Sequence, residues 1–380
     1  MKTLVPVLAA LTMLFACSLP GGFSAVESPA STATIMADTS TQTPASPDIP
    51  VPPTAIPPSP TPVSPELGVD TVARLSIFST FGQGEALRSL AFSPDGTALA
   101  SAGGNSEDFA IRLWDVGSGL HLQTLQGHTS IVWGVAFSPD GQMLASASSD
   151  GTGKIWDWRA GAVIESLDFP NEVVSVAFSP DGQTLAVGGV DGFPNASVWT
   201  FAVPSWQPGL KLAEFWNIPS LAFMPDGQYL VGGGTSRNAR IWRTSDGLSL
   251  FTLSHSGQVS SLAISPDGST IASGLCEASG ASGTCARGGV WFWDVHTGKL
   301  MRKVSDFTDW VERVAYSLDG SVLIAGSRDE TLRFYATSDF QPILVTSSPG
   351  GGGVLAVSPD GRLLATSGRN GLIHLWRVGP

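Results

Sequence analysis

The residues that could do acid–base, metal or phosphate chemistry in this chain are few, and their spacing fits no common catalytic arrangement. The five histidines are scattered and show no zinc-ligand spacing: His121, His128, His255, His296 and His374. Residues 151–154 (Gly-Thr-Gly-Lys) lack the upstream glycine and the following Ser or Thr of a phosphate-binding loop, so a turn explains them better. We therefore expect no catalytic residue, no metal site and no cofactor.

A different chemistry, lipid attachment, is indicated near the N-terminus. An apolar stretch of twelve residues, Leu4 to Phe15, is too short to span a bilayer but suits a signal peptide. Residues 14–17 (Leu-Phe-Ala-Cys) resemble the bacterial lipobox, in which the cysteine is diacylated and becomes the mature N-terminus. We predict a lipoprotein-type signal peptide at residues 1–17, with Cys17 anchored on the outer face of the cytoplasmic membrane. The alternatives are an ordinary cleaved signal and a cytoplasmic protein.

The other two cysteines, Cys276 and Cys285, border a short stretch rich in Gly, Ala and Ser. In an exported protein such a pair favours a disulfide, which for a loop of this length contributes up to about 3 kcal/mol of stability. A metal site is the alternative, but no histidine lies nearby in the sequence.

Composition divides the chain into a tether and a domain. Residues 18–67 are dominated by Pro, Ser, Thr and Ala, and no Lys or Arg occurs between Lys2 and Arg74. Such a segment cannot bury enough apolar area to offset its loss of conformational entropy, so we predict a disordered linker. The formal net charge of the chain is −12, which repels nucleic acid and argues against it as a partner.

Internal repetition dominates residues 68–380. A Pro-Asp-Gly turn or a close variant recurs seven times, with its aspartates at spacings of 45, 41, 45, 41, 52 and 41 residues. Pro presets φ, Asp bonds locally and Gly accepts a positive φ, so each turn predicts a tight hairpin. An aromatic residue follows each turn at a nearly constant offset: Trp114, Trp156, Trp199, Trp242, Trp293, Tyr335 and Trp376. Four short strands per unit are typical of a propeller blade.

These units resemble the WD-40 repeat family, whose fold is a β-propeller. Three of them carry the literal Trp-Asp dipeptide: Trp114-Asp115, Trp156-Asp157 and Trp293-Asp294. One unit also has the family's Gly-His pair, at Gly127-His128. In that unit the resemblance implies a structural hydrogen-bond tetrad: His128, Ser146, Asp150 and Trp156. The other units have lost most of the tetrad, and Ser254-His255 stands where Gly-His is expected.

We predict an all-β, seven-bladed WD-repeat propeller at residues 68–380, preceded by the tether. The sequence ends at Pro380, four residues after Trp376, so the last unit lacks a fourth strand. Residues 72–79 are similar to the fourth strands of other units. We therefore expect this N-terminal strand to complete the last blade and close the ring, which leaves no open sheet edge.

One face of the predicted disc carries the departures from the repeat. The 52-residue spacing marks an insertion at 276–285, and long connections in the first and third units contain Phe109 and Phe193. These segments join second and third strands, so they share a face with the entries to the first strands. Three tryptophans lie at or near those entries: Trp133, Trp216 and Trp310. Loops on a rigid scaffold concentrate function, and Trp is enriched in interface hot spots, so this face is predicted to bind a partner. The alternative is that these tryptophans pack between blades.

Two functions of different classes are consistent with this architecture. The first is a non-catalytic protein–protein interaction scaffold on the cell envelope, which holds an unidentified protein or peptide and touches the membrane only through its lipid. The second is a propeller enzyme or small-molecule binder similar to quinoproteins or lactonases, with its ligand in the central channel. The enzyme or small-molecule binder requires metal ligands that converge on the axis, whereas the scaffold requires an aromatic rim. The residues favour the scaffold. A spacer without a dedicated pocket is a third hypothesis.

Overall fold

The computed structural model describes residues 65–82, 86–104, 108–192, 195–213, 217–280, 284–349, 353–367 and 370–379. The predicted signal peptide, Cys17 and most of the predicted linker lie outside these described residues. Within them the chain is all-β apart from one short 3₁₀ helix, η1 (Val72–Arg74). Leu67, which composition places in the linker, is buried, and its N–H donates to the Gly361 carbonyl oxygen at 2.8 Å, so Leu67 packs with the domain.

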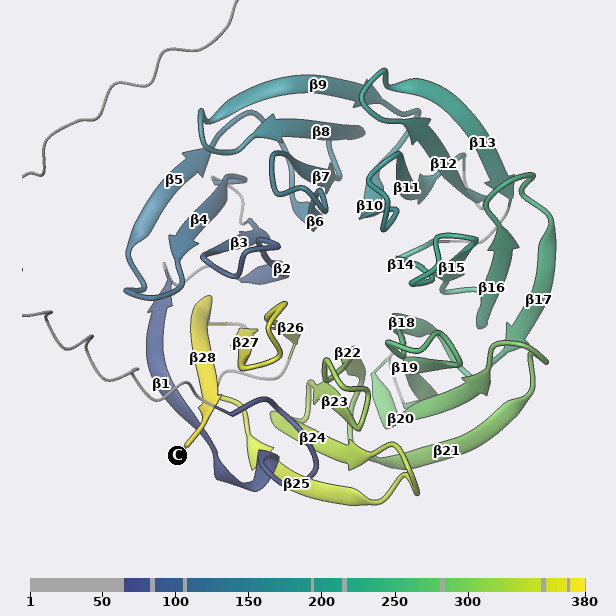
Figure 1. Ribbon diagram of the computed structural model, residues 1–380. Coiled ribbons are helices and arrows are strands. Elements are labelled where there is room, and N and C mark those ends of the chain that lie inside the picture. The colour runs from purple at the N-terminus through teal and green to yellow at the C-terminus, as the bar shows by residue number, and fades with distance from the viewer. Residues whose placement is uncertain are drawn as a thin grey trace, which may run out of the picture. The chain divides into compact units, whose positions relative to one another are not determined.

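Among the described residues, twenty-eight strands form seven four-stranded antiparallel sheets, arranged as blades around a central channel (Figure 1). The predicted seven-bladed fold is confirmed. Blades 1 to 4 comprise, from the channel outward, β2 (Leu87–Phe92), β3 (Ala98–Gly103), β4 (Ile111–Asp115), β5 (His121–Leu125); β6 (Val132–Phe137), β7 (Leu144–Ser148), β8 (Thr152–Asp157), β9 (Ala162–Asp168); β10 (Val173–Phe178), β11 (Thr184–Val190), β12 (Ala196–Ala202), β13 (Gln207–Ala213); and β14 (Ser220–Phe223), β15 (Tyr229–Gly233), β16 (Asn238–Arg243), β17 (Ser249–Ser254). Blades 5 to 7 comprise β18 (Val259–Ile264), β19 (Thr270–Ser279), β20 (Cys285–Asp294), β21 (Leu300–Phe307); β22 (Val311–Tyr316), β23 (Val322–Ser327), β24 (Thr331–Ala336), β25 (Pro342–Ser347); and β26 (Val354–Val357), β27 (Leu363–Ser367), β28 (Leu372–Val378), β1 (Leu75–Gly82).

Blade 7 is closed by the N-terminal strand β1, as the sequence predicts. This strand pairs antiparallel with β28, from Leu75 opposite Val378 to Gly82 opposite Leu372. Figure 1 shows β1 as the outermost strand, beside the C-terminal strand β28. The two ends of the folded domain therefore belong to one sheet, and that sheet completes the ring.

The first hairpin of each blade turns at the repeated Pro-Asp-Gly segment. The glycine of every such turn has a φ between 68° and 72°, a conformation that residues with a side chain rarely adopt. At Asp140 the carboxylate accepts the Ser138 hydroxyl at 2.5 Å and the Gln142 N–H at 3.0 Å. These hydrogen bonds, the one from Ser138 first, lower the pKa of Asp140. The repeated aspartates thus form turns, as predicted.

The hydrophobic core lies between the blades rather than within any one of them. Ile111 of blade 1 packs in one cluster with Leu144 and Trp156 of blade 2. Leu90 of blade 1 packs in another with Leu375 of blade 7, so the apolar contacts also continue across the ring closure. Because each sheet has two apolar faces, stacking in a ring buries both faces of every blade.

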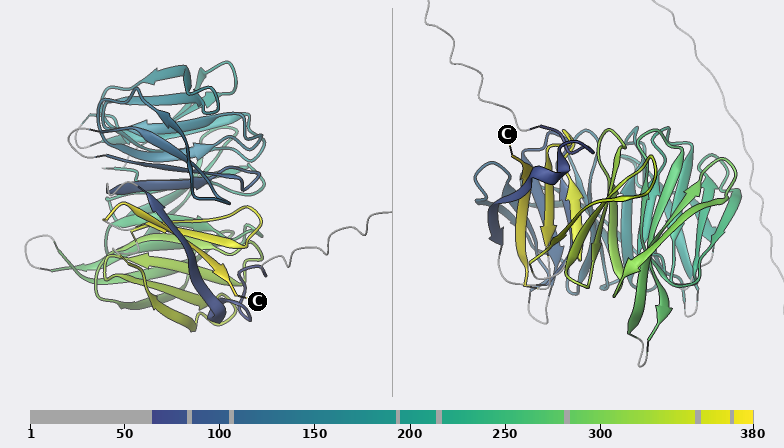
Figure 2. Two further views of the ribbon diagram at one scale, coloured as in Figure 1. Left: turned by 90° about the vertical axis from the view of Figure 1, so that its left-hand side faces the viewer. Right: turned by 90° about the horizontal axis from the view of Figure 1, so that it is seen from below.

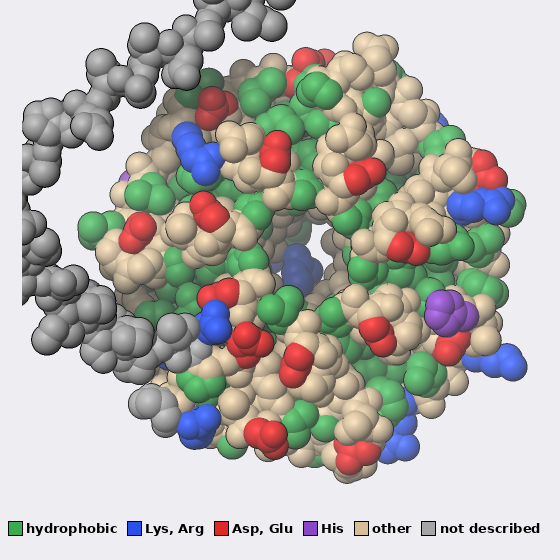
Figure 3. Space-filling view, viewed as in Figure 1, with side chains coloured by type: hydrophobic (Ala, Val, Ile, Leu, Met, Phe, Trp, Pro, Cys, Tyr) green, Lys and Arg blue, Asp and Glu red, His purple; other side chains and the backbone are tan. Residues whose placement is uncertain are grey.

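The two faces of the disc carry different connections. The turn face bears the Pro-Asp-Gly hairpins and the links from third to fourth strands, and it faces the viewer in Figures 1 and 3. The loop face bears the links from second to third strands and from each blade to the next. Figure 2 shows the C-terminal end of β28 at the turn face and the extended hairpin of β19 and β20 projecting from the loop face.

The ring closure makes Val378 a sensitive position. This residue is 1% exposed, in the cluster that joins blades 6 and 7. A Val378→Asp substitution would bury an unpaired carboxylate, so we expect the free energy of unfolding to fall by about 3 kcal/mol or more.

Val345→Asp is the matched control, because Val345 is 53% exposed on the outer strand β25. Its unfolding free energy is expected to change by no more than about 0.5 kcal/mol. Urea unfolding followed by circular dichroism measures both, and equal stabilities of the two variants would contradict the packing described for β28.

Candidate functional site

The central channel opens on the loop face into a cavity of about 250 Å³. Equivalent positions of the seven first strands contribute to its wall, because the repeat places one side chain per blade toward the channel. These positions hold Arg88, Trp133, Val174, Pro219, Ser260, Glu312 and Gly353. The backbone ring is therefore regular, and the chemistry of the channel mouth depends on which side chains occupy it.

Trp133 is fixed in this wall by a chain of hydrogen bonds. Its indole N–H donates to the Ser149 hydroxyl at 2.6 Å, and that hydroxyl donates to the Glu172 carboxylate at 3.0 Å. The guanidinium of Arg88 lies over the indole ring, 5.1 Å from its centroid. The ring is thus held at its edge and covered by a cation, which is a favourable cation–π geometry.

Trp310 forms a second aromatic–arginine pair on the other side of the mouth. The guanidinium of Arg328 lies 5.7 Å from the centroid of its ring. Arg328 also forms an ion pair with Glu312, and the backbone N–H of Trp310 donates to its neighbour Asp309 at 2.7 Å. Both indoles are half-buried and border the same cavity.

Of the five residues predicted for a partner-binding face, the structure brings Trp133 and Trp310 together. Phe109 is half-buried in the link between β3 and β4, where its ring lies against Gly104, and it is not part of the cavity wall. Phe193 and Trp216 lie outside the described residues.

The mouth also contains three arginines that sequence reasoning missed: Arg88, Arg313 and Arg328. Arg313 occupies a first-strand position that is serine in four other blades: Ser89, Ser175, Ser220 and Ser261. It reaches past blade 7, and its Nη2 donates to the carbonyl oxygen of Arg88 in blade 1 at 2.9 Å. Comparing the repeats position by position would have singled this residue out.

The guanidinium groups of Arg88 and Arg313 give the mouth a positive character. Burial lowers the pKa of Arg313, the charge of Arg88 lowers it further, and Glu312 opposes both effects. The normal arginine pKa is so high that the group stays charged at neutral pH. The Nε of Arg88 is buried without a hydrogen-bond partner among the described residues. Figure 3, which looks down the channel from the turn face, shows a basic side chain deep in the opening.

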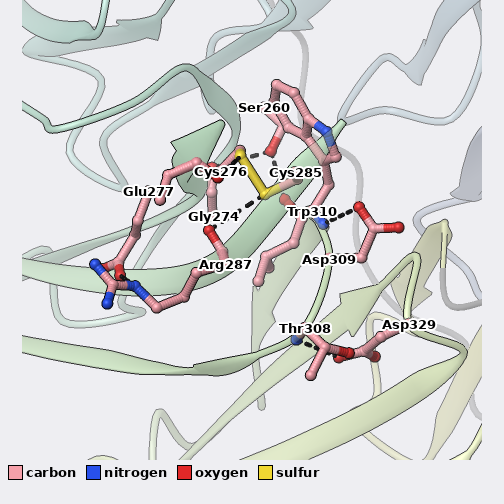
Figure 4. Close-up of a disulfide and its surroundings, with 12 residues drawn as sticks. Ser260, Gly274, Cys276, Glu277, Cys285, Arg287, Thr308, Asp309, Trp310 and Asp329 are labelled. Atoms are coloured by element: carbon pink, nitrogen blue, oxygen red, sulfur yellow. Dashed lines mark hydrogen bonds and ion pairs between the residues drawn. A yellow bond between two sulfur atoms is a disulfide. The ribbon is translucent and has the colours of Figure 1, made fainter. Parts of the chain in front are cut away.

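Cys276 and Cys285 form the predicted disulfide, with their Cα atoms 5.7 Å apart (Figure 4). They lie in the ten-residue strands β19 and β20, so the predicted insertion at 276–285 extends the sheet as a hairpin. Inside the hairpin the buried carboxylate of Glu277 accepts hydrogen bonds from the Ser305 hydroxyl at 2.7 Å and from Arg287 Nε at 3.1 Å.

The base of this hairpin contacts the wall of the channel mouth. The backbone N–H of Cys276 donates to the carbonyl oxygen of Gln258 at 3.3 Å, and the Ser260 hydroxyl donates to that of Gly274 at 3.0 Å. Gln258 and Ser260 both line the cavity, and Figure 4 shows Ser260 and Trp310 beside the disulfide. The cross-linked hairpin thus supports the part of the wall that holds Trp310.

The four predicted tetrad residues are joined by hydrogen bonds in blade 2. His128 contacts the Asp150 carboxylate and the Ser146 hydroxyl, each at 2.7 Å, and the Trp156 indole N–H donates to that hydroxyl at 2.8 Å. Burial lowers the pKa of His128 and outweighs the opposing effect of Asp150. Burial would raise the pKa of Asp150, but hydrogen bonds led by the one from Thr152 lower it to about 2. This network lies in the core, away from the channel mouth.

A shortened version of the network occurs in blade 5. The Trp293 indole N–H donates directly to His255 Nε2 at 3.1 Å, and His255 Nδ1 donates to the Leu253 carbonyl oxygen at 2.9 Å.

Among the described residues no three His, Cys, Asp or Glu side chains are close enough to hold a metal ion. The same part of the chain contains no helix long and apolar enough to cross a membrane.

The sequence matches the family model described as "WD domain, G-beta repeat" at seven segments: residues 75–115, 119–157, 163–193, 213–243, 247–287, 298–335 and 341–377. The chain belongs to the WD40 repeat family. The first two segments, 75–115 and 119–157, each run from an outer strand to the end of the third strand of the next blade, so the WD40 repeat is offset from the blade by one strand. This offset is the reason why β1 completes blade 7. WD40 propellers generally bind protein partners and are mostly non-enzymatic scaffolds.

The WD40 chain is similar to short stretches of several curated relatives. "WD repeat and SOCS box-containing protein 1" of Danio rerio is 36% identical over 92 residues, which are 23% of this chain and 22% of that protein. "Autophagy-related protein 16" of Arabidopsis thaliana is 24% identical over 148 residues, 37% of this chain and 27% of that protein. "Eukaryotic translation initiation factor 3 subunit I" of Pyricularia oryzae is 35% identical over 92 residues, 24% and 26% of the two chains. The matches thus span about a quarter of each relative.

His255 gives the WD40 domain a defined pH dependence. Burial lowers the pKa of His255 from its ordinary value near 6.5 to about 4; the hydrogen bond to the Leu253 carbonyl oxygen opposes this effect, and the charge of Lys303 adds to it. A folded-state pKa below the unfolded value contributes stability above pH 6.5, and that contribution is lost as the pH falls toward 4. We expect this loss to be about 2 to 3 kcal/mol over that interval.

The measurement is chemical unfolding at pH 7, 6, 5 and 4. The His255→Gln variant should lose less stability than the wild type between pH 6.5 and 4, because glutamine does not titrate. His296→Gln, at an exposed turn position, should keep the wild-type profile. A wild-type profile in His255→Gln would show that His255 does not carry this dependence.

Proposed function

We propose that this WD40 protein is a non-catalytic scaffold that binds a protein or peptide at the channel mouth on its loop face. The observation that carries the proposal is the presence of two aromatic–arginine pairs in one cavity, Arg88 on Trp133 and Arg328 on Trp310. Trp and Arg are strongly enriched in interface hot spots, because each covers a large area and keeps a polar group available. The cavity of about 250 Å³ lies just below the usual range of about 300 to 1,000 Å³ for small-molecule pockets, which suits a side chain of a larger partner.

The family relationship and the charge of the chain support this proposal. WD40 propellers generally bind protein partners, and one relative is named as a subunit of a translation initiation factor. The net charge of −12 opposes binding to nucleic acid, whose phosphates would be repelled at long range. The proposed partner is therefore a protein or peptide.

The proposal includes display on the cell envelope. Cys17, after the apolar stretch from Leu4 to Phe15, would carry a lipid on the outer face of the cytoplasmic membrane, and the membrane would be contacted through that anchor only. The folded domain begins at the turn face, where Leu67 bonds to Gly361 of a Pro-Asp-Gly turn.

Site-specific photo-crosslinking tests where the partner binds. A photoreactive amino acid at Gln258 lies at the mouth, and one at Gln142 lies on the turn face; both positions are exposed. In membranes of the native host we expect one reproducible crosslinked protein from position 258 and none from 142. A Trp133→Ala, Trp310→Ala double variant should reduce that product at least tenfold, because both walls of the cavity are removed.

Crosslinking from position 142 alone, or an undiminished product in the double variant, would contradict the proposed mouth. If no protein is crosslinked and added small molecules or metals raise the melting temperature, the channel-ligand alternative replaces the scaffold. Circular dichroism of the double variant establishes that its propeller is folded.

The lipid anchor makes a separate prediction. Cys17→Ser should move the protein from the membrane fraction to the soluble envelope fraction, because a serine cannot be diacylated at this position. The matched control is the Cys276→Ser, Cys285→Ser double variant, which removes the disulfide and should stay with the membrane. Equal membrane association of the Cys17 variant and the control would disprove the anchor.

A further inference from the structure

We propose that the channel mouth receives a carboxylate, supplied by an Asp or Glu side chain of the partner and bound by Arg88 and Arg313. This inference rests on the proposed function, since it names the chemistry of the partner at the same site. It is drawn from the charges, the unused hydrogen-bond donors and the shape of the cavity.

The first step is the charge of the two arginines. The Arg313 guanidinium lies against the backbone of Arg88, whose carbonyl oxygen accepts from its Nη2 at 2.9 Å, and both side chains line the same cavity. No carboxylate of the described residues forms an ion pair with either guanidinium. Two partly buried cations without a direct ion-pair partner are costly, and a bound anion would offset that cost.

The acidic side chains nearest to the mouth are engaged with other groups. Glu312 pairs with Arg328, and Glu172 accepts the Ser149 hydroxyl at 3.0 Å. Through these contacts they hold the two aromatic–arginine pairs in place. Although the net charge of the chain is −12, the positive charges of Arg88 and Arg313 thus remain available to a ligand.

The second step is the supply of free hydrogen-bond donors. Arg88 Nε is buried and has no partner among the described residues, and the Nη atoms of Arg313 are fixed by two backbone carbonyl oxygens, those of Arg88 and Glu312. A guanidinium held in this way keeps further N–H groups in a rigid plane. Carboxylates accept such parallel N–H groups in pairs, which is the strongest geometry for this interaction.

The third step distinguishes a peptide from a simple anion. Asn217 lines the same cavity, and its Oδ1 is buried without a hydrogen-bond donor in the described structure. A peptide carries backbone N–H groups beside its carboxylate and satisfies both the cations and this acceptor. Inorganic phosphate or a free dicarboxylate has no N–H group to offer.

The size and walls of the cavity agree with one inserted side chain. Its volume of about 250 Å³ admits a Glu or Asp side chain and the adjacent backbone. Trp133 and Trp310 supply apolar walls, which exclude water and strengthen charge-assisted hydrogen bonds. Gly353 contributes no side chain at the equivalent position of blade 7, between the blades that carry Arg313 and Arg88.

The test uses the full-length protein and a pair of fluorescent, C-terminally amidated nonapeptides of Gly and Ser that differ only in a central Glu or Gln, so that the Gln peptide contains no carboxylate. In polarisation titrations we expect the Glu peptide to bind at least tenfold more tightly. Arg88→Met and Arg313→Met should each reduce that affinity at least tenfold, because each loses the charge and keeps an apolar stem. Arg377→Met is the matched control, since Arg377 is exposed on blade 7 over Phe78, and it should leave the affinity unchanged.

Equal or absent binding of the two peptides at millimolar concentration would overturn the proposal, and this comparison needs no variant to fold. Competition by glutarate or inorganic phosphate as strong as by the Glu peptide would also overturn it, since the site would then be one for free anions. The partner crosslinks from position 258 distinguish a failure of the carboxylate inference from a failure of the proposed scaffold function. If they persist in Arg88→Met and Arg313→Met, the carboxylate inference fails while the scaffold remains. If they are lost in these variants, the inference is supported.

Discussion

The interaction on which the rest of this structure depends is the burial of apolar sheet faces between neighbouring blades. Ile111 of blade 1 is buried in a cluster to which blade 2 contributes Leu144 and Trp156, and similar clusters join neighbouring blades around the ring. An open row of blades would leave one apolar sheet face exposed at each end. The pairing of β1 with β28 closes the row into a ring, so the first strand of the domain completes its last sheet.

The closed ring also explains how a candidate binding site arises in a repetitive molecule. Packing between blades fixes the outer positions, whereas the channel end of each first strand is free to vary. At this layer the chain places two tryptophans, three arginines and two glutamates around one cavity. The disulfide-bearing hairpin of blade 5 supports the same region from outside, through Gln258 and Ser260. Packing between blades therefore constrains the residues of the core, whereas the cavity residues lie where packing constrains the choice of side chain least.

Local rules made most of the fold predictable from the sequence. The Pro-Asp-Gly turns, the missing fourth strand and the Cys276–Cys285 disulfide depend on neighbouring residues or on simple counting, and all three are confirmed. The site was predictable only in part. Trp133 and Trp310 were identified by their place at strand entries, but the role of Arg313 depends on Arg88, 225 residues earlier in the chain. This contact between Arg313 and Arg88 forms only when the ring is closed, and no pattern of neighbouring residues predicts it.

The position of β1 has a mechanical consequence. Tension applied through the N-terminal side passes first to Leu67, whose N–H donates to the Gly361 carbonyl oxygen, and then to this outermost strand, whose hydrogen bonds to β28 run along its whole length. Peeling β1 away would at once expose the edge of β28 and uncover Leu75 and Val378 at the join. Once the contact of Leu67 with Gly361 has been broken, a pulling force and the opening of the ring therefore act on the same hydrogen bonds, those between β1 and β28.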